Sequence, residues 1–228
     1  MSMTKEYPIT IVAGHILFDD DRGTCLLVDT GSPFSFHSDA VIEIGDDTFS
    51  VPKSLTGVTA DYISDKVGER IDGLVGMNIL AELGVLIDVP HGRLVFGHPT
   101  DGMKKIPSRC GVAYLTAEMD IRGRRTKVII DTGAPTSYVD PSLTEGLDPV
   151  GRVEDFNPLV PGDVFETPVY EFPASFDGHG FTMRAGHLPS ILQMAVSIIG
   201  ISGVVGMELL KWQPLLINSE GIWIQQGI

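Results

Sequence analysis

The feature that most constrains the fold of this chain is an internal duplication. The stretch Thr24–Ser32 reads TCLLVDTGS, and Thr126–Ala134 reads TKVIIDTGA. Two more pairs of related blocks follow in the same order, namely Asp72–Leu80 with Ser202–Leu210 and Val85–Phe96 with Leu215–Ile224. Three matched pairs in one order indicate that a single structural unit occurs twice. We assign residues 1–100 to the first unit and 101–228 to the second.

The local patterns are those of β-strands. Cys25–Val28 and Lys127–Ile130 are short and apolar with β-branched residues, which is typical of buried strands. Ile9–Phe18 and Val112–Ile121 alternate imperfectly between apolar and polar residues and are followed by turn-forming residues. The Gly- and Pro-containing stretch Gly97–Gly102 is the expected linker. The sequence therefore predicts an all-β protein with two lobes.

The two units differ in the length of the segment between their repeated glycines. The segment from Gly133 to Gly206 is longer than the one from Gly31 to Gly76, and most of the extra residues fall within 142–170. We predict a long hairpin there. Only three short helices are expected. One lies within the loop Pro52–Gly68, and the other two are at Met77–Leu83 and Met207–Trp212.

Asp29 and Asp131 occupy the same place in the two copies of Asp-Thr-Gly. A pseudo-two-fold axis between the units would bring both turns face to face, with the carboxyl groups close together. Like charges at that distance cannot both ionise, so the two groups would share a proton and titrate as a coupled pair. The ionised group could then take a proton from water while the protonated group hydrogen-bonds a carbonyl oxygen. This chemistry requires no metal and no cofactor.

These paired motifs resemble those of the aspartic-protease superfamily, the pepsins and retropepsins. The resemblance covers nearly the whole chain and implies a bilobal pepsin-like fold of two retropepsin-like β-barrel lobes. It assigns Asp29 and Asp131 as the catalytic pair and supporting roles to the rest of both turns. Thr30 and Thr132 would hydrogen-bond across the lobe interface. Gly31 and Gly133 would shape the two loops. An apolar strand would cross behind each turn at Gly76 and Gly206.

The residue after each Asp-Thr-Gly differs between the units, being Ser32 in the first and Ala134 in the second. Pepsin-like enzymes usually have Ser or Thr at this place, whose hydroxyl helps to hold the carboxylate charged, whereas retropepsins usually have Ala. Hydrogen bonds to the charged form lower a pKa, so we predict that Asp29 is the more readily ionised of the pair.

A second departure concerns the flap, the hairpin that covers the substrate in pepsins. The first unit is too short for one, so we predict that a flap would come from the second unit, over Val153–Tyr170. Its substrate-facing side chains would be Phe156, Phe165 or Tyr170. The resemblance also predicts an inter-lobe sheet in which the run Pro8–Ala13 pairs with Gly221–Ile228.

Charge and motif content exclude several classes of function. The formal net charge is −14 and the isoelectric point is near 4.6, which disfavours nucleic acids and anionic membranes as partners. The six histidines lack metal-site spacing, so no metal is expected. Cys25 and Cys110 form no disulfide framework. Since there is no apolar N-terminal signal and Met194–Leu210 is too broken to span a bilayer, we expect a cytoplasmic protein.

The function that follows is an aspartic endopeptidase, which hydrolyses a peptide bond in an extended segment bound between the lobes. Because both lobes belong to one chain, a monomer would suffice. Two alternatives remain open on the sequence alone. One is a catalytically silent module that binds extended peptides, since a fold does not fix a function. The other is an acid–base enzyme that acts on a small molecule.

Overall fold

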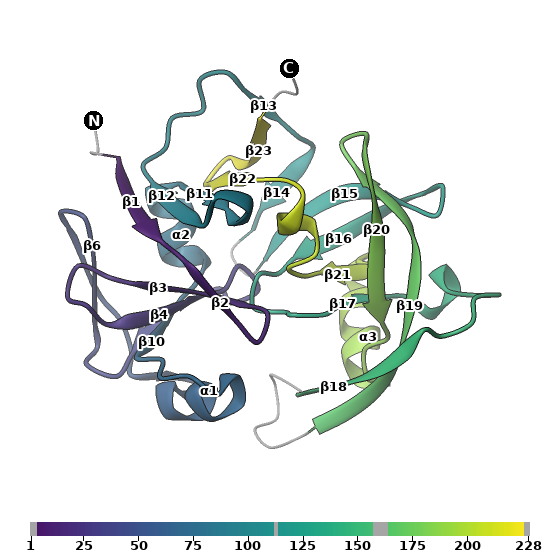
Figure 1. Cartoon of the computed structure of the whole chain (residues 1–228), viewed down its shortest axis with the longest axis horizontal. Coiled ribbons are helices and arrows are strands. Elements are labelled where there is room, and N and C mark those ends of the chain that lie inside the picture. Colours follow the sequence, from purple (N-terminus) through teal and green to yellow (C-terminus); the bar gives the residue numbers. More distant parts are fainter. Residues whose placement is uncertain (1–3, 112–113, 157–163, 226–228) are drawn as a thin grey trace.

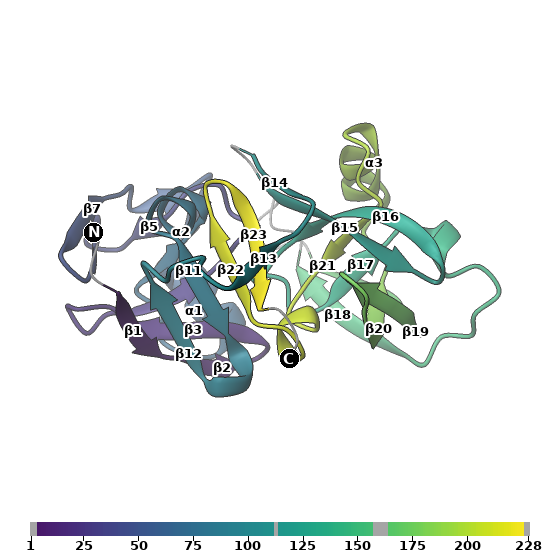
Figure 2. The same cartoon turned by 90° about the horizontal axis from the view of Figure 1, so that it is seen from above.

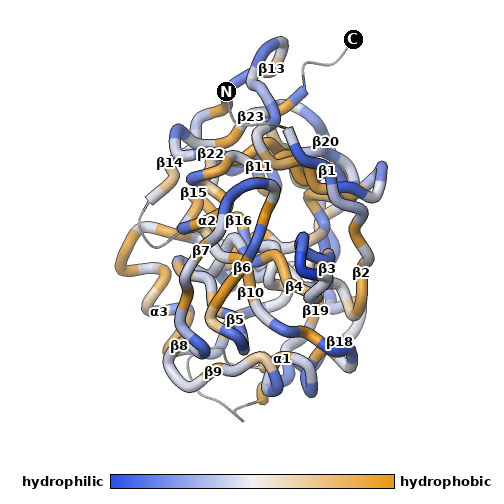
Figure 3. Tube along the Cα trace, turned by 90° about the vertical axis from the view of Figure 1, so that its left-hand side faces the viewer, coloured by the Kyte–Doolittle hydropathy of each residue, from blue (hydrophilic) through white to orange (hydrophobic). Residues whose placement is uncertain are grey.

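The computed structural model describes residues 4–111, 114–156 and 164–225. Two lobes lie side by side with a sheet between them, and Figure 2 shows the strands β22 (Leu215–Asn218) and β23 (Gly221–Gln225) at that central position. Hydrophobic stretches alternate with hydrophilic ones along the chain (Figure 3). Strands make up most of the regular structure in the described residues, so the molecule is mostly β, as predicted.

The central sheet has six strands, three from each half of the chain. Their order is β1 (Lys5–Pro8), β12 (Arg93–Phe96), β11 (Val85–Asp88), β22, β23 and β13 (Met103–Lys105). The two halves meet at the antiparallel pair β11–β22, where Leu86 lies opposite Leu216. Leu216 is fully buried and Leu86 nearly so. Burial of apolar side chains across this pair therefore stabilises the contact between the lobes.

The predicted pairing of the chain ends in this sheet was wrong in detail. The N-terminal strand of the sheet is β1, not Pro8–Ala13, and it pairs with β12 rather than with the C-terminal strand. The segment Ile9–Phe18 instead forms a hairpin of β2 (Thr10–Val12) and β3 (His15–Asp19). Ala13 and Gly14 turn the chain between them, both with positive φ, as a tight two-residue hairpin turn requires.

The first lobe is built on a five-stranded sheet in the order β2, β3, β4 (Cys25–Val28), β10 (Gly73–Val75) and β5 (Phe36–His37). The helix α1 (Ala60–Val67) packs on this sheet through Ala60, Ile63 and Val67. Its polar residues, among them Asp61 and Lys66, lie on the opposite side, so the sequence pattern of the helix matches its half-buried position. It follows the small hairpin β8 (Ser54–Leu55) and β9 (Val58–Thr59), within the predicted loop and helix.

The second lobe is built on an eight-stranded sheet that repeats this plan and extends it. Its strands, in order, are β14 (Ser108–Cys110), β15 (Leu115–Ile121), β16 (Arg124–Ile130), β21 (Gly203–Val205), β17 (Ser137–Val139), β20 (His179–Gly186), β19 (Val164–Phe176) and β18 (Gly151–Phe156). The helix α3 (Ser190–Ile198) was not among the predicted helices. It occupies the same place in the chain order as α1 in the first lobe, just before the strand that precedes the repeated glycine.

The hairpin predicted within 142–170 is present as β18 and β19, which pair from Gly151–Val169 to Phe156–Val164. Its turn, 157–163, lies outside the described residues. The corresponding hairpin of the first lobe, β6 (Val41–Ile44) and β7 (Asp47–Ser50), is short. The turn of this short hairpin is held by β1, because the N–H of Gly45 donates to the hydroxyl of Tyr7 at 2.8 Å. Figure 1 shows β18 beside α1 of the first lobe.

One of the two helices expected after the repeated glycines is correct and one is shorter than predicted. The helix α2 covers Met77–Leu83 and ends at Gly84. At the corresponding place in the second lobe, after Gly206, the 3₁₀ turn η3 (Leu209–Lys211) forms in place of a helix. Pro214 follows closely there, and a proline keeps the residue before it out of the helical conformation.

Candidate active site

The two Asp-Thr-Gly turns are held by equivalent strand pairs. In the first lobe β4 runs parallel to β10, and the N–H of Asp29 donates to the carbonyl oxygen of Val75 at 3.0 Å. In the second lobe β16 runs parallel to β21, and the N–H of Asp131 donates to Val205 at 2.9 Å. Each aspartate therefore begins its turn at the same point of the same sheet pattern.

Gly76 and Gly206 stand where the crossing strand passes behind each turn. A Cβ atom at Gly76 would lie 2.6 Å from the carbonyl oxygen of Phe34, and one at Gly206 would lie 2.1 Å from that of Ala134. Only glycine allows the backbone to approach so closely. The N–H of each glycine donates to a serine hydroxyl, Ser35 in the first lobe at 2.9 Å and Ser137 in the second at 3.0 Å.

Thr30 and Thr132 bond to each other across the lobe interface. The N–H of Thr30 donates to Oγ1 of Thr132 at 3.0 Å, and the N–H of Thr132 donates to Oγ1 of Thr30 at 2.9 Å. Each hydroxyl also donates at 2.8 Å to a carbonyl oxygen of the opposite lobe, Ile130 for Thr30 and Val28 for Thr132. Both threonines are buried, so these four bonds fix the two turns relative to each other.

The two aspartates face each other across this junction. A Cβ atom at Gly31 would lie 2.4 Å from the carboxyl carbon of Asp131, and one at Gly133 would lie 2.5 Å from that of Asp29. Each carboxyl group is thus in contact with the glycine of the opposite turn. The arrangement brings together the residues predicted from the sequence for both turns.

The two carboxyl groups differ in pKa. Burial raises the pKa of Asp29, while the N–H groups of Gly31 and Ser32, at 2.8 and 3.0 Å from Oδ1, and a hydrogen bond with Asp131 lower it in part. Burial and the negative charge of Asp29 raise the pKa of Asp131 well above that of an ordinary aspartate. The two backbone N–H bonds to Asp29 favour its charged form, and a charge on Asp29 in turn favours the protonated form of Asp131.

This order of pKa values is the expected one, but the cause predicted for it was wrong. The hydroxyl of Ser32 donates to the carbonyl oxygen of Phe34 at 2.8 Å and not to Asp29. The backbone N–H of Ser32 makes the bond to the carboxylate instead. Ala134, its counterpart, has no hydroxyl, so the side chain at this place does not distinguish the two carboxyl groups.

The three aromatic residues predicted to face the substrate lie in different places. Phe156, at the end of β18, packs edge-to-face on Tyr62 of α1 with 6.3 Å between ring centroids. Phe165 packs against Tyr138 at 5.9 Å, within the second lobe. Tyr170 stacks on His187 at 5.1 Å and packs against the main core. Of these three aromatic residues, Phe156 is the one that packs on a ring of the first lobe.

Tyr138 and Asp155 also belong to this region, and the sequence reasoning missed them. The hydroxyl of Tyr138 donates to the carboxylate of Asp155 on β18. The pKa of Tyr138 is raised first by burial and then by the charges of Asp155 and Asp131. Aligning the two copies could have indicated Tyr138, since it stands where the first unit has the buried Phe36.

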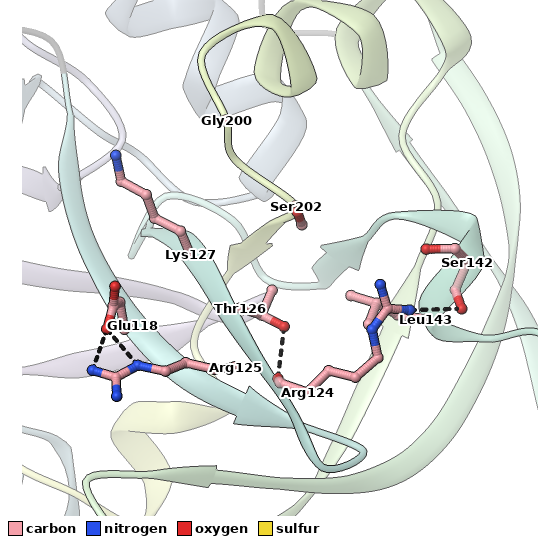
Figure 4. A pocket seen from close by; sticks show the side chains of 9 residues that line it. All are labelled: Glu118, Arg124, Arg125, Thr126, Lys127, Ser142, Leu143, Gly200 and Ser202. Carbon is pink, nitrogen blue, oxygen red and sulfur yellow. Dashed lines mark hydrogen bonds and ion pairs between the residues drawn. The ribbon is translucent and has the colours of Figure 1, made fainter.

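No group of three or more His, Cys, Asp or Glu side chains that could hold a metal ion occurs within 4–111, 114–156 and 164–225. In the described part of the chain no helix has both the length and the apolar character that crossing a membrane takes. A pocket of about 310 Å³ lies between β15, β16 and the residues after α3 (Figure 4). Its charged residues include Arg125, which pairs with Glu118, and it contains neither aspartate of the pair.

Comparison with known proteins finds a similar solved structure but no similar sequence. No model of a known protein family matches the sequence, and no curated protein matches it either. Among solved structures, the aspartic proteinase from Irpex lacteus superimposes with a TM-score of 0.52 at 13% sequence identity. The match covers 98% of this chain and 97% of that one. The chain therefore has the fold of a pepsin-like aspartic proteinase, from its first strand to its last.

Proposed function

We propose that the protein is an aspartic endopeptidase in which Asp29 and Asp131 activate a water molecule for peptide hydrolysis. The observation that carries the proposal is the contact of each carboxyl group with the glycine of the opposite turn, at 2.4 and 2.5 Å from the position of an added Cβ. This crossed packing, together with the hydrogen bond between the two carboxyl groups, supports a shared proton, which is the state that this chemistry needs.

The difference in pKa assigns the two roles. Ionised Asp29 accepts a proton from the attacking water, while protonated Asp131 donates a hydrogen bond to the oxygen of the scissile carbonyl. As the water oxygen bonds to the carbonyl carbon, the proton of Asp131 passes to the developing oxyanion. Collapse of the tetrahedral gem-diol breaks the C–N bond. The leaving amine takes the proton that Asp29 received, and one hydroxyl of the gem-diol returns its proton to Asp131 as the carboxyl group of the product forms. The pair is then ready for another cycle.

An extended peptide is the substrate that best suits this site. The hairpin β18–β19 reaches from the second lobe to α1 of the first, where Phe156 contacts Tyr62, and an extended segment would lie beneath it. Because the four threonine bonds join two lobes of one chain, we propose that a monomer forms the complete site.

The proposal is tested by incubating a complex peptide library with the protein between about pH 3 and 7 and identifying the products by mass spectrometry. Asp29→Asn and Asp131→Asn should make no cuts, and Asp46→Asn, an exposed aspartate in the β6–β7 turn, should cut as the wild type does. Binding without cleavage would contradict a peptidase and indicate a peptide-binding module. Neither binding nor cleavage would direct attention to a small substrate.

A further inference from the structure

The basic residues of this acidic chain are concentrated at one place in the second lobe. Of its 16 Lys and Arg residues, four fall within positions 122–127, namely Arg122, Arg124, Arg125 and Lys127. These positions cover the turn between β15 and β16 and the first half of β16. Like charges held so close together repel one another. In a chain with a formal net charge of −14, solubility does not account for such a cluster.

Three of these cations line the pocket of about 310 Å³ between β15, β16 and the residues after α3. Figure 4 shows Arg124 beside Ser142 on one side of it, Arg125 and Lys127 on the other side, and Ser202 between them. The volume is at the lower end of the range of about 300–1,000 Å³ that is typical of small-molecule sites. The pocket is thus large enough for a small ligand and has positive groups at two of its sides.

Most of the positive charge in the pocket is not neutralised by the protein. Arg125 pairs with Glu118, the one carboxylate among the described lining residues. Lys127 lies opposite Glu118 in the β15–β16 ladder, but neither Lys127 nor Arg124 has an ion pair in the described part of the chain. Arg124 makes a long hydrogen bond of 3.4 Å to the carbonyl oxygen of Ser142. The pocket therefore has a positive potential, which attracts anions.

Two other carboxylates of this region are bound elsewhere. Asp120 accepts a hydrogen bond from the N–H of Gly123 at 2.8 Å, within the turn between β15 and β16. Asp140 accepts from the N–H of Ser142 at 2.9 Å and from the side chain of Gln193 at 3.3 Å. Neither carboxylate lines the pocket. They do not replace an anion within it.

The pocket and the aspartate pair lie at opposite ends of the same two strands. Where the parallel strands β16 and β21 begin, the N–H of Ser202 donates to the carbonyl oxygen of Lys127 at 3.0 Å. Where they end, the N–H of Asp131 donates to Val205 at 2.9 Å. A ligand in the pocket would therefore leave the aspartate pair free, and the pocket is a separate site.

We propose that this pocket binds a small, non-aromatic molecule that carries two phosphate groups. One phosphate would bond to the planar fork of Arg124, and the other to Lys127 and Arg125. The hydroxyl groups of Ser142 and Ser202 line the space between and can donate to a polar carrier such as a sugar. None of the described lining residues is aromatic, so a nucleotide base would have no ring to stack on. The inference is independent of the proposed peptidase function.

The test is isothermal titration calorimetry at about 0.15 M NaCl, where charges more than about 8 Å apart are largely screened. The probes are glucose 1,6-bisphosphate, inorganic tripolyphosphate, glucose 6-phosphate and citrate. We expect glucose 1,6-bisphosphate to bind about tenfold or more tightly than glucose 6-phosphate and citrate, because its two phosphates engage both groups of cations. Asp29→Asn should bind it as the wild type does, since the site is separate.

Lys127→Ala should weaken the binding of glucose 1,6-bisphosphate about tenfold, the value of one hydrogen bond to a charged group. Lys53→Ala, an exposed lysine of the first lobe, is the matched control and should leave the affinity unchanged. Arg124→Ala should lose about tenfold or more, and Arg124→Lys, which keeps the charge without the fork, should lose less. Glu118→Gln should tighten binding, because it removes the carboxylate that competes for Arg125, whereas the exposed Glu82→Gln should not.

These measurements decide the inference whether or not the protein cleaves peptides. Absence of binding for both glucose 1,6-bisphosphate and tripolyphosphate would overturn it. Equal losses for Lys127→Ala and Lys53→Ala would also overturn it, since they would indicate a general attraction of anions. If citrate or glucose 6-phosphate bound as tightly as glucose 1,6-bisphosphate, the assignment to two phosphate groups would be wrong. Loss of binding in Asp29→Asn would place the ligand at the aspartate pair instead.

Discussion

Thr30 and Thr132 form a reciprocal pair in which the N–H of each donates to the hydroxyl oxygen of the other, at 3.0 and 2.9 Å. Both hydroxyls then donate to carbonyl oxygens of the opposite lobe. Each threonine side chain therefore serves as acceptor and donor at once. Because both residues are buried, water cannot replace a bond that is removed.

Thr30→Val keeps the shape of the side chain and removes its oxygen. The N–H of Thr132 and the carbonyl of Ile130 would lose their partner, so we expect the free energy of unfolding to fall by about 1–3 kcal/mol. Urea unfolding measures the change. Thr30→Ser, which keeps the oxygen, should cost clearly less, and equal losses for the two variants would contradict the importance of the hydroxyl.

Gly31→Ala tests the close approach of the two turns. The new methyl group would lie 2.4 Å from the carboxyl group of Asp131, which the N–H of Gly133 also holds at 2.9 Å. We expect a displacement of the carboxyl group, a loss of stability of about 1–3 kcal/mol and a fall in peptide cleavage of about a hundredfold. Gly180→Ala is the control, because the nearest atom to its Cβ is 4.0 Å away. Unchanged cleavage by Gly31→Ala would contradict the described contact.

Much of the fold could be predicted from the repeated blocks. The strands β4 and β16 and the helix α2 follow from apolar runs that end at Asp-Thr-Gly or begin after Gly76, since these are local patterns. Which strands neighbour one another in the central sheet was not predictable in the same way. The run Ile9–Phe18 could equally form one strand or a hairpin, and the turn at Ala13 and Gly14 decides between them.

Phe156→Ala tests the contact between the hairpin and the first lobe. The edge-to-face pair with Tyr62 contributes about 0.5–1.5 kcal/mol beyond the area that it buries, so the backbone amides of β18 should exchange with solvent about 2–10 times faster. Hydrogen exchange measured by NMR reports this. Val150→Ala, at an exposed site near the start of the hairpin, should leave exchange unchanged. If both variants behave alike, the contact with Tyr62 does not hold the hairpin.

Asp131→Asn should change how stability depends on pH. Between the pKa of an unfolded aspartate and the raised pKa of Asp131, the native state keeps a proton that the unfolded chain has released, so stability falls as pH rises. Asparagine removes this dependence. Relative to the wild type, the variant should gain on the order of 1 kcal/mol in free energy of unfolding from pH 4 to pH 7. Urea unfolding at both pH values measures this change, with Asp46→Asn as the control. If the difference in free energy of unfolding between Asp131→Asn and the wild type were the same at pH 4 and pH 7, the account would be contradicted.

The parts of the candidate site that the sequence did not reveal depend on contacts between distant segments. Ser32 is next to the first aspartate in sequence, yet its hydroxyl bonds to Phe34 because the turn directs it there. Tyr62 and Phe156 come from opposite lobes and meet only because the hairpin reaches the first lobe. Of the three aromatic residues expected to face the substrate, Tyr170 instead stacks on His187, because its place on β19 is within the second lobe.

The most direct test of the account is a titration of the two aspartates by NMR, with carbon-13 in the aspartate carboxyl groups. Asp29→Asn and Asp131→Asn serve to assign the signals. We predict that the two groups titrate as a coupled pair, that the step assigned to Asp131 lies well above the ordinary aspartate range, and that it moves down when Asp29 is neutralised. Two independent titrations in the ordinary range, unchanged by either substitution, would contradict a shared proton and the mechanism built on it.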